Sequence, residues 1–248
     1  MSIRVDNFSF GYTPDEVILR NISFNVKKNS SIAIVGSSGC GKSTLLRLIS
    51  GILKRSRNNI YDGKISVDGF DPEVYVKKGK IGFMFQEPTL FPNLSVKKNI
   101  LIPLKFLKKK QYKEVNEFIE AVGLTKYVDY LPSQLSGGMK SRVALARTFV
   151  SKPAVLLLDE PFSSLDVKWK YLLYEELQRL KELYSATTIM VTHDIREALF
   201  LSNHVIVLSS NGEILKNINI SNKIDNTKDR LNQLHYEYDL IHQLLMAN

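Results

Sequence analysis

The stretch Gly36–Thr44 reads Gly-Ser-Ser-Gly-Cys-Gly-Lys-Ser-Thr and fits the pattern Gly-x-x-x-x-Gly-Lys-Ser/Thr without a gap. The short apolar run Ser31–Val35 precedes it, and Leu45–Ile49 follows with leucines and an isoleucine at helical spacing. The three glycines permit a tight turn whose N–H groups, together with the N-terminus of the helix, can cradle phosphate oxygens. The sequence therefore predicts a strand, a phosphate-binding loop and a helix, in this order.

Each residue of this loop is a candidate nucleotide contact. The Lys42 ammonium would neutralise the β- and γ-phosphates, and the Ser43 hydroxyl would ligate Mg²⁺. Cys40 is the only cysteine of the chain, which excludes an internal disulfide and favours a reducing compartment, with the thiol as a small loop filler. The predicted nucleotide-binding residues of the loop are Gly36, Ser37, Ser38, Gly39, Cys40, Gly41, Lys42, Ser43 and Thr44.

Composition limits the class of protein only loosely. The 248 residues, 44% of them hydrophobic, suffice for one large α/β domain or two small lobes. The net charge of +9 is compatible with nucleic acid, with an anionic membrane surface or with a generally lysine-rich composition. No run approaches the ~20 apolar residues that cross a bilayer, and no N-terminal signal is evident. We therefore expect a soluble chain that can sit on a membrane.

The N-terminal segment predicts a small antiparallel sheet. Ser2–Phe10 and Val17–Val26 alternate as strands, and Tyr12–Asp15 forms the turn between them. Tyr12, at the edge of this sheet, either stacks on a nucleotide base or is an ordinary aromatic at a strand end. A further strand is expected at Lys64–Gly69, after a polar loop.

Polar side chains follow three apolar strands. Gln86 closes Ile81–Phe85, and its amide can turn toward a metal or water, or away from them. Asp159 and Glu160 follow the buried run Val155–Leu158, which as a parallel strand beside the loop strand would deliver both carboxylates to the phosphate end. We predict Asp159 as the outer metal ligand and Glu160 as the general base for water.

A histidine ends the next predicted strand. His193 follows Thr187–Val191 and Thr192. A lone histidine is usually structural, but one at the same sheet edge as the two acids can reach a γ-phosphate or its attacking water. We favour this second interpretation.

Residues Ser95–Val150 read as a helical insert, in which Gly123 is a plausible helix stop and Lys108–Lys110 a solvated face. Ser136-Gly137-Gly138 begins a helix within it and again presents bare N–H groups to an anion. By itself this triplet could be a mere helix cap, but in this chain it predicts a second phosphate site. Ser163–Asp166 is expected to open the next helix as an N-cap with an acid in its first turn.

The C-terminal part predicts a hairpin and a helix. Val205–Leu208 and Gly212–Ile218 form the hairpin, and Asn219–Asn226 is a polar loop. In the tail, spacings of three and four give one apolar helix face, which either docks on its own domain or serves a partner. The residues of this face are Leu231, Leu234, Tyr238, Ile241 and Leu245.

This ordered set of motifs resembles that of the ATP-binding-cassette (ABC) ATPases over nearly the whole chain. The resemblance implies a Walker A loop, Q-loop, signature motif, Walker B strand with catalytic Glu, D-loop and switch His, and it makes Tyr12 the adenine-stacking aromatic. These elements correspond, in order, to Gly36–Thr44, Gln86, Leu135–Met139, Val155–Glu160, Ser163–Asp166 and His193.

The resemblance also implies the fold and its subdomains. We expect an α/β fold, a P-loop NTPase (RecA-like) core with an antiparallel β subdomain and a helical insert subdomain. The core and β subdomain would comprise residues 1–86 and 151–220, and the insert about 87–150. Residues 221–248 would form a C-terminal helical tail beyond the ATPase domain.

Two details favour the importer branch of the family. Met139 stands where the signature motif usually ends in Gln, a Met familiar in importers resembling the nitrate, sulfonate and taurine type and in some lipid-transport relatives. Met84–Pro88 also resembles that importer group. We therefore expect an importer of a small anion or organic solute, with a lipid-transport ATPase as the alternative. A soluble ATPase acting on nucleic acid is less favoured, because such proteins usually carry two cassettes or a long coiled-coil insert.

The resemblance further implies the cofactors, partners and roles. ATP and Mg²⁺ would bind, with Ser43, Gln86 and Asp159 at the metal and with Glu160, His193 and Gln86 in catalysis. Two copies would pair head to tail, so that Ser136–Gly138 of one faces the ATP of the other. Permease subunits, a substrate-binding protein and a peripheral place on the cytoplasmic face of the inner membrane are expected, and no nucleic acid.

Overall fold

The computed structural model describes residues 2–107, 115–220 and 227–247, with the backbone alone for residues 227–232. The predicted lysine face Lys108–Lys110, residues 221–226 of the predicted polar loop and the side chain of Leu231 lie outside these residues.

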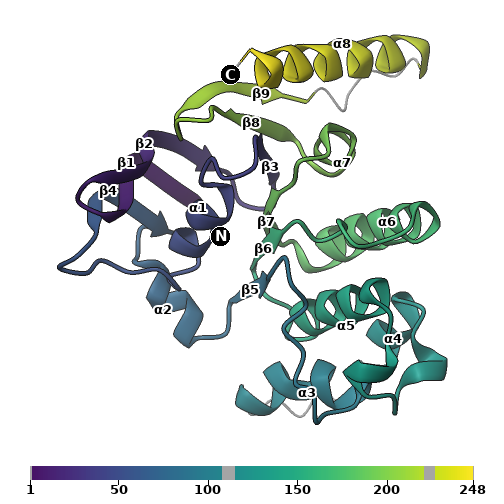
Figure 1. Ribbon diagram of the computed structural model, residues 1–248. Coiled ribbons are helices and arrows are strands. Elements are labelled where there is room, and N and C mark those ends of the chain that lie inside the picture. The colour runs from purple at the N-terminus through teal and green to yellow at the C-terminus, as the bar shows by residue number, and fades with distance from the viewer. Residues whose placement is uncertain (1, 108–114, 221–226, 248) are drawn as a thin grey trace.

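The described residues form two sheets (Figure 1). The smaller is antiparallel, in the order β2 (Glu16–Val26), β1 (Ile3–Thr13) and β4 (Ile60–Val67). β1 runs through Tyr12 to Thr13, which pairs with Glu16, so the turn is shorter than predicted. The antiparallel sheet predicted from the alternating N-terminal residues is confirmed.

The larger sheet has the order β5-β6-β7-β3-β8-β9. Its first five strands are parallel, and β9 pairs antiparallel with β8 as the predicted hairpin. The strands are β5 (Ile81–Met84), β6 (Val155–Asp159), β7 (Thr187–Val191), β3 (Ser31–Gly36), β8 (His204–Leu208) and β9 (Ile214–Asn219).

The prediction that β6 lies beside the loop strand β3 is wrong, because β7 lies between them. Parallel strands covered on both faces are apolar throughout, so their composition does not reveal their neighbours. The acids after β6 nevertheless lie at the phosphate end of the sheet, as predicted. All five parallel strands end at one edge of the sheet, and the residues after β5, β6 and β7 therefore gather there.

The two faces of this sheet carry different cores. Alternate strand residues such as Ile34 and Leu157 pack on α1 (Lys42–Ile49) and on the small sheet, whereas Val35 and Leu158 pack with helices of the insert and of the C-terminal half. This alternation follows from the period of two in a strand. The phosphate loop leaves β3 at the junction of the two cores.

The insert is a bundle of short helices. It contains α3 (Val96–Phe106), α4 (Val115–Ala121), α5 (Gly137–Phe149) and two single 3₁₀ turns, Thr125–Tyr127 and Pro132–Gln134. The three helices gather beside β5, at the opposite end of the sheet from β9 (Figure 1). Gly123, at a φ of +65°, ends α4 as predicted.

One short helix was not predicted. The helix α2 (Pro72–Lys77) lies between β4 and β5 and begins with Asp71 as N-cap and proline at its first position. Both residue types are start signals that the sequence displays, but a helix of six residues is too short for an apolar period to appear.

The other helices lie over the sheet face that also packs on the insert. They are α6 (Val167–Tyr184), α7 (Ile195–Leu201) and α8 (Thr227–Met246). On α8, Ile241 is fully buried in the core, and Leu234, Tyr238 and Leu245 pack against the same cluster. The predicted apolar face of the tail therefore docks on its own domain. Among the described residues, no helix has the length and apolarity needed to cross a bilayer.

Candidate functional site

The phosphate loop is shaped by two glycines in the left-handed region. Gly39 and Gly41 have φ values of +84° and +97°. A Cβ on Gly41 would lie 2.8 Å from a methyl carbon of Leu19 and 2.9 Å from one of Ile18, so a side chain does not fit there. Gly41 is also the N-cap of α1 and supplies no side-chain cap, which leaves N–H groups of the first turn open to a ligand.

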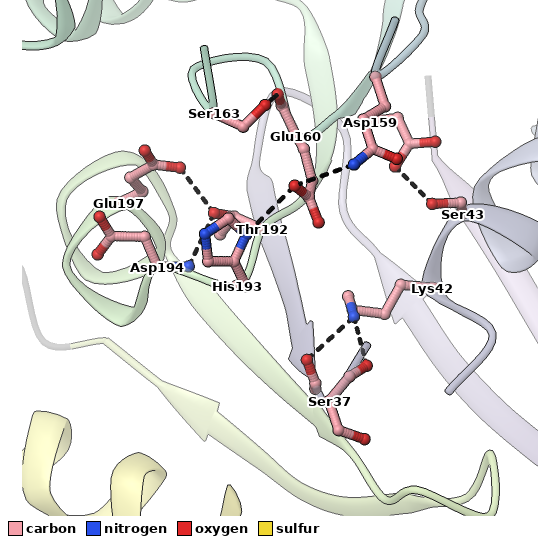
Figure 2. Close-up of polar contacts among 12 residues, drawn as sticks. Ser37, Lys42, Ser43, Asp159, Glu160, Ser163, Thr192, His193, Asp194 and Glu197 are labelled. Atoms are coloured by element: carbon pink, nitrogen blue, oxygen red, sulfur yellow. Dashed lines mark hydrogen bonds and ion pairs between the residues drawn. The ribbon is translucent and has the colours of Figure 1, made fainter. Parts of the chain in front are cut away.

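Lys42 is folded back onto the loop. Its ammonium donates hydrogen bonds to the carbonyl oxygens of Gly36, at 3.0 Å, and Ser37, at 2.7 Å (Figure 2). Within the described part of the chain, no carboxylate forms an ion pair with it. The loop thus holds a nearly buried cation on neutral acceptors alone, where a phosphate would be a better partner.

Cys40 is buried, and its Sγ would lie 2.7 Å from a Cβ placed on Gly36. The thiol belongs to the core shared with the small sheet, which supports its interpretation as a loop filler. Ser37, Ser38 and Gly39 are exposed at the tip.

Tyr12 lies beside the loop. Its hydroxyl is 3.2 Å from Oγ1 of Thr44, and its ring meets Phe10 edge to face at 5.1 Å between centroids. Tyr12 is 42% exposed. The small sheet thus delivers an aromatic to Thr44, which lies 32 residues away in sequence at the end of the loop.

Asp159 at the end of β6 reaches the first turn of α1. Ser43 donates a hydrogen bond of 2.7 Å to its Oδ1, while Oδ2 is buried and has no hydrogen-bond partner among the described residues. Burial raises the pKa of the Asp159 carboxyl above its ordinary value, although the bond from Ser43 lowers it in part. A buried, unpartnered carboxylate oxygen beside a hydroxyl is a donor set that suits Mg²⁺, so these residues fit the ion.

Side chains that follow three different strands meet at one carboxylate oxygen, Oε2 of Glu160. Oε2 of Glu160 lies 3.4 Å from Nε2 of Gln86 and 3.2 Å from Nδ1 of His193, and Figure 2 shows the His193 ring turned toward it. The Glu160 side chain is 17% exposed and that of His193 65%. The structure therefore brings together the three residues predicted as catalytic.

Glu160 has a backbone φ of +45°, which is uncommon for a residue with a side chain. Its N–H is held by the carbonyl of Val191, and its carbonyl accepts hydrogen bonds from the N–H and the hydroxyl of Ser163. Such a conformation persists only where the surroundings hold it, and it occurs preferentially at functional sites.

The turn after Glu160 corrects one prediction. Asp166, not Ser163, caps α6, because its side chain accepts from the N–H of Trp169. Ser163 is engaged with the Glu160 carbonyl, and the Leu165 N–H bonds back to Phe162. These bonds extend the turn and delay the start of the helix to Val167.

The second predicted phosphate site does not meet the first within one chain. Ser136 caps α5 by accepting from the Met139 N–H, and a Cβ on Gly137 would meet open space. A Cβ on Gly138 would come within 3.3 Å of the Ser164 carbonyl, so the turn after Glu160 packs against this helix start. In the described part of the chain, no hydrogen bond or ion pair joins Ser136–Gly138 to the loop.

Sequence analysis missed a buried polar cluster behind His193. It is centred on Glu197 of α7, which is joined to Thr192, Lys170 and Tyr174. The sequence offers only a weak signal, since Glu197 directly precedes the apolar run Ala198–Leu201. Its partners lie too far away in sequence to be found from spacing.

Comparison with known proteins identifies the family. The family model of ABC transporters matches residues 19–163. An aliphatic sulfonates import ATP-binding protein of Bacillus anthracis, SsuB, is 39% identical over 93% of this chain and 90% of its own length. A spermidine/putrescine import ATP-binding protein of Thermotoga maritima, PotA, is 42% identical over 82% of this chain and 54% of its own length.

A solved structure has the same fold. The bacterial ABC transporter cassette MJ0796, solved as a dimer, is 30% identical, covers 88% of this chain and 98% of its own, and superposes with a TM-score of 0.78. The same cassette is also known in a post-hydrolysis state with ADP and inorganic phosphate. The phosphate loop, the strand ends that converge on Glu160 and these relatives lead to one conclusion: the chain belongs to the ABC transporter family, as an ATP-binding and ATP-hydrolysing cassette.

Proposed function

We propose that this cassette is the ATP-hydrolysing subunit of a membrane importer for a small anion or organic solute. The observation that carries the proposal is the convergence of Gln86, Glu160 and His193 at the sheet edge that also bears Asp159 and the phosphate loop. Bound ATP would place its phosphates on Gly36–Thr44 and its adenine on Tyr12. Lys42 would exchange its carbonyl partners for the β- and γ-phosphates.

Asp159, Ser43 and Gln86 are proposed to hold Mg²⁺. The unpartnered Oδ2 of Asp159 supports this assignment, and the Gln86 amide lies close enough to the acids to turn its oxygen inward. When bound, the ion neutralises charge on the phosphate oxygens of ATP.

Glu160 is proposed to activate water. Its carboxylate accepts a proton as the water oxygen bonds to the γ-phosphorus, and the bond from phosphorus to the ADP oxygen breaks. His193, which lies against the same carboxylate oxygen, would orient Glu160 and donate a hydrogen bond to a γ-phosphate oxygen. Inorganic phosphate and ADP are the products.

A second copy of the chain is proposed to complete each site. Ser136–Gly138 presents N–H groups that no loop among the described residues uses, and Gly137 leaves room for a ligand. A two-fold head-to-tail pair would place this triplet on the γ-phosphate of the partner's ATP, twice per dimer. The relative MJ0796, whose cassette was solved as a dimer, supports the pairing of two copies.

The permease is proposed to dock in an apolar groove between β5 and α3. The groove has a volume of about 440 Å³ and is lined by Phe83, Phe85, Phe91, Pro103 and Phe106, among others. Phe91 and Phe106 are 49% and 80% exposed. Exposed aromatics around a groove favour a protein partner, and such docking would hold the cassette peripherally at the cytoplasmic face of the inner membrane.

The groove is also connected to both halves of the ATP site. Arg147 of α5 lines it and donates a hydrogen bond of 2.7 Å to the carbonyl of Thr89, which lies three residues after Gln86. A movement of α5, the helix that begins with the signature motif, would therefore shift both the groove and the segment after Gln86.

The names of the relatives support the type of substrate. SsuB of B. anthracis is an aliphatic sulfonates importer subunit, and other relatives are named for different solutes. A separate substrate-binding protein would select the solute. The lipid-transport alternative shares the cassette and differs in its permease.

Docking is tested by co-expression with a multi-span permease encoded in the adjoining genes. The double variant Phe91→Asp, Phe106→Asp should appear in the supernatant, whereas wild type and the control Tyr236→Asp, an exposed aromatic on α8, should sediment with the membranes. ATP affinity should be equal in all three proteins. Co-purification of the double variant at wild-type yield, or stimulation of wild-type ATPase by DNA or RNA, would contradict the importer proposal.

A further inference from the structure

A buried carboxylate lies behind the switch histidine. Glu197 of α7 is only 2% exposed, yet three donors reach its two oxygens. Oε1 accepts from Lys170 Nζ at 2.9 Å and from the Tyr174 hydroxyl at 3.0 Å, and Oε2 accepts from the Thr192 hydroxyl at 2.6 Å. Since a buried charge is tolerated only when it is paired and hydrogen-bonded, these donors define its position closely.

Thr192 connects this carboxylate to His193. Its hydroxyl donates to Glu197 and accepts from the backbone N–H of Asp194, at 3.0 Å (Figure 2). The backbone N–H of Thr192 donates to the Ile34 carbonyl. The backbone is therefore fastened immediately before and after His193. The His193 ring itself is mostly exposed and contacts Glu160 at 3.2 Å, so its position depends on this fastening.

The other donors come from α6. Lys170 and Tyr174 lie within the first turns after the N-cap Asp166, and Lys170 Nζ is also 3.8 Å from Asp194 Oδ2. The turn before Asp166 bonds back to the Glu160 carbonyl through Ser163. The contacts thus form a closed ring that starts at Glu160, passes through α6 and Glu197, and returns through His193.

We infer that Glu197 is a positioning residue for hydrolysis, which acts through the Thr192 hydroxyl to hold His193 against Glu160 and to tie it to α6. The inference rests on the role proposed above for His193. A purely structural role would predict lost stability with no specific effect on the chemical step. A positioning role predicts a lower kcat with an unchanged KM for ATP, because neither Glu197 nor Thr192 touches the phosphate loop.

Thr192→Val tests the inference, since it removes the hydroxyl and keeps the shape. Because His193 is then displaced, Thr192→Val should lower kcat roughly ten- to a hundredfold at an unchanged KM for ATP. Thr192→Ser, which restores the hydroxyl, should recover most of the rate. The matched control is Thr188→Val, because Thr188 lies on β7, the strand that Thr192 directly follows, is buried and, among the described residues, has no hydrogen-bond partner for its hydroxyl. Its kcat should equal that of wild type.

A double variant distinguishes action through His193 from a general effect. Single-turnover hydrolysis is measured with enzyme in excess, so that slow rates are resolved. In the His193→Ala background, Thr192→Val should cost nothing further, since the group it positions is absent. An equal fold-loss in both backgrounds, or a wild-type kcat for Thr192→Val alone, would overturn the inference.

The single variant His193→Ala tests the proposed function separately from this inference. If His193→Ala hydrolyses ATP at the wild-type rate, the role of His193 is wrong, whatever Thr192→Val does. Thermal unfolding shows whether each variant is folded. Should Thr192→Val not fold, Glu197→Asp takes its place, since it keeps the charge but withdraws the carboxylate from Thr192. A wild-type kcat for that variant would equally contradict the inference.

Discussion

At the scale of single residues, Glu160 has the surroundings of a base. Its carboxylate contacts an amide and an imidazole, and no lysine or arginine in the described residues pairs with it. Glu160→Gln keeps the shape and should lower phosphate release by a factor of ~10² to 10⁴ while ATP affinity is retained. ATP should then trap a closed dimer, visible by sizing chromatography. Glu175→Gln, an exposed acid on α6, is the control, and unchanged turnover in Glu160→Gln would remove Glu160 from the mechanism.

Asp159 makes stability depend on pH in a definite direction. Because burial raises its pKa in the folded state, the folded protein binds a proton more readily than the unfolded chain does. The stability that this group contributes is thus present at low pH and is lost as pH rises from the ordinary aspartate value through the raised one. Without Mg²⁺, Asp159→Asn should therefore gain stability over wild type as the pH is raised across this window.

Thermal unfolding of both proteins from pH 4 to 7 measures this difference. The variant shares every other titrating group, so the comparison isolates Asp159. Adding Mg²⁺ and ATP should stabilise wild type more than Asp159→Asn, since the carboxylate then has a cation. A stability difference that does not change with pH would show that Asp159 is not perturbed as the geometry indicates.

At the scale of elements, α8 is held by its apolar face. Ile241 is fully buried in the core, and the helix packs on α7 and β8. Ile241→Ala should cost about 2 to 5 kcal/mol of unfolding free energy, whereas Tyr236→Ala, 68% exposed on the same helix, should stay within about 0.5 kcal/mol of wild type. Urea unfolding measures both, and equal costs would mean that α8 does not dock as described.

At the scale of the whole molecule, the proposed function divides each site between two copies of the chain. We expect a mixture of Lys42→Ala and Ser136→Arg chains to regain activity that neither has alone, because one of the two sites in each mixed dimer carries no lesion. With random pairing and independent sites, about a quarter of the wild-type rate should return.

The control mixture combines Lys42→Ala with Glu160→Gln. Both lesions then fall in the same half of the site, so every mixed dimer has two damaged sites and should stay inactive. Steady-state phosphate release measures both mixtures. Recovery in the control, or none in the first mixture, would exclude sharing of sites between chains.

The sequence by itself determined what depends on neighbouring residues. The phosphate loop, the cap at Ser136, the stop at Gly123 and the apolar strands follow from φ preferences, hydrogen bonds a few residues apart and the period of side chains along a strand. These local rules also placed Asp159, Glu160 and His193 at strand ends. The resemblance of their order to a known family then supplied their roles.

Only the tertiary structure decided which of these parts meet. The apolar strands carry no mark of their order, so the place of β7 between β6 and β3 was not predictable from composition. The approach of Tyr12 to Thr44, the meeting of Gln86 and His193 on one Glu160 oxygen, and the burial of Glu197 among donors from two other elements join residues far apart in sequence. Such contacts are selected by the packing of the whole core, which no local pattern of residues encodes.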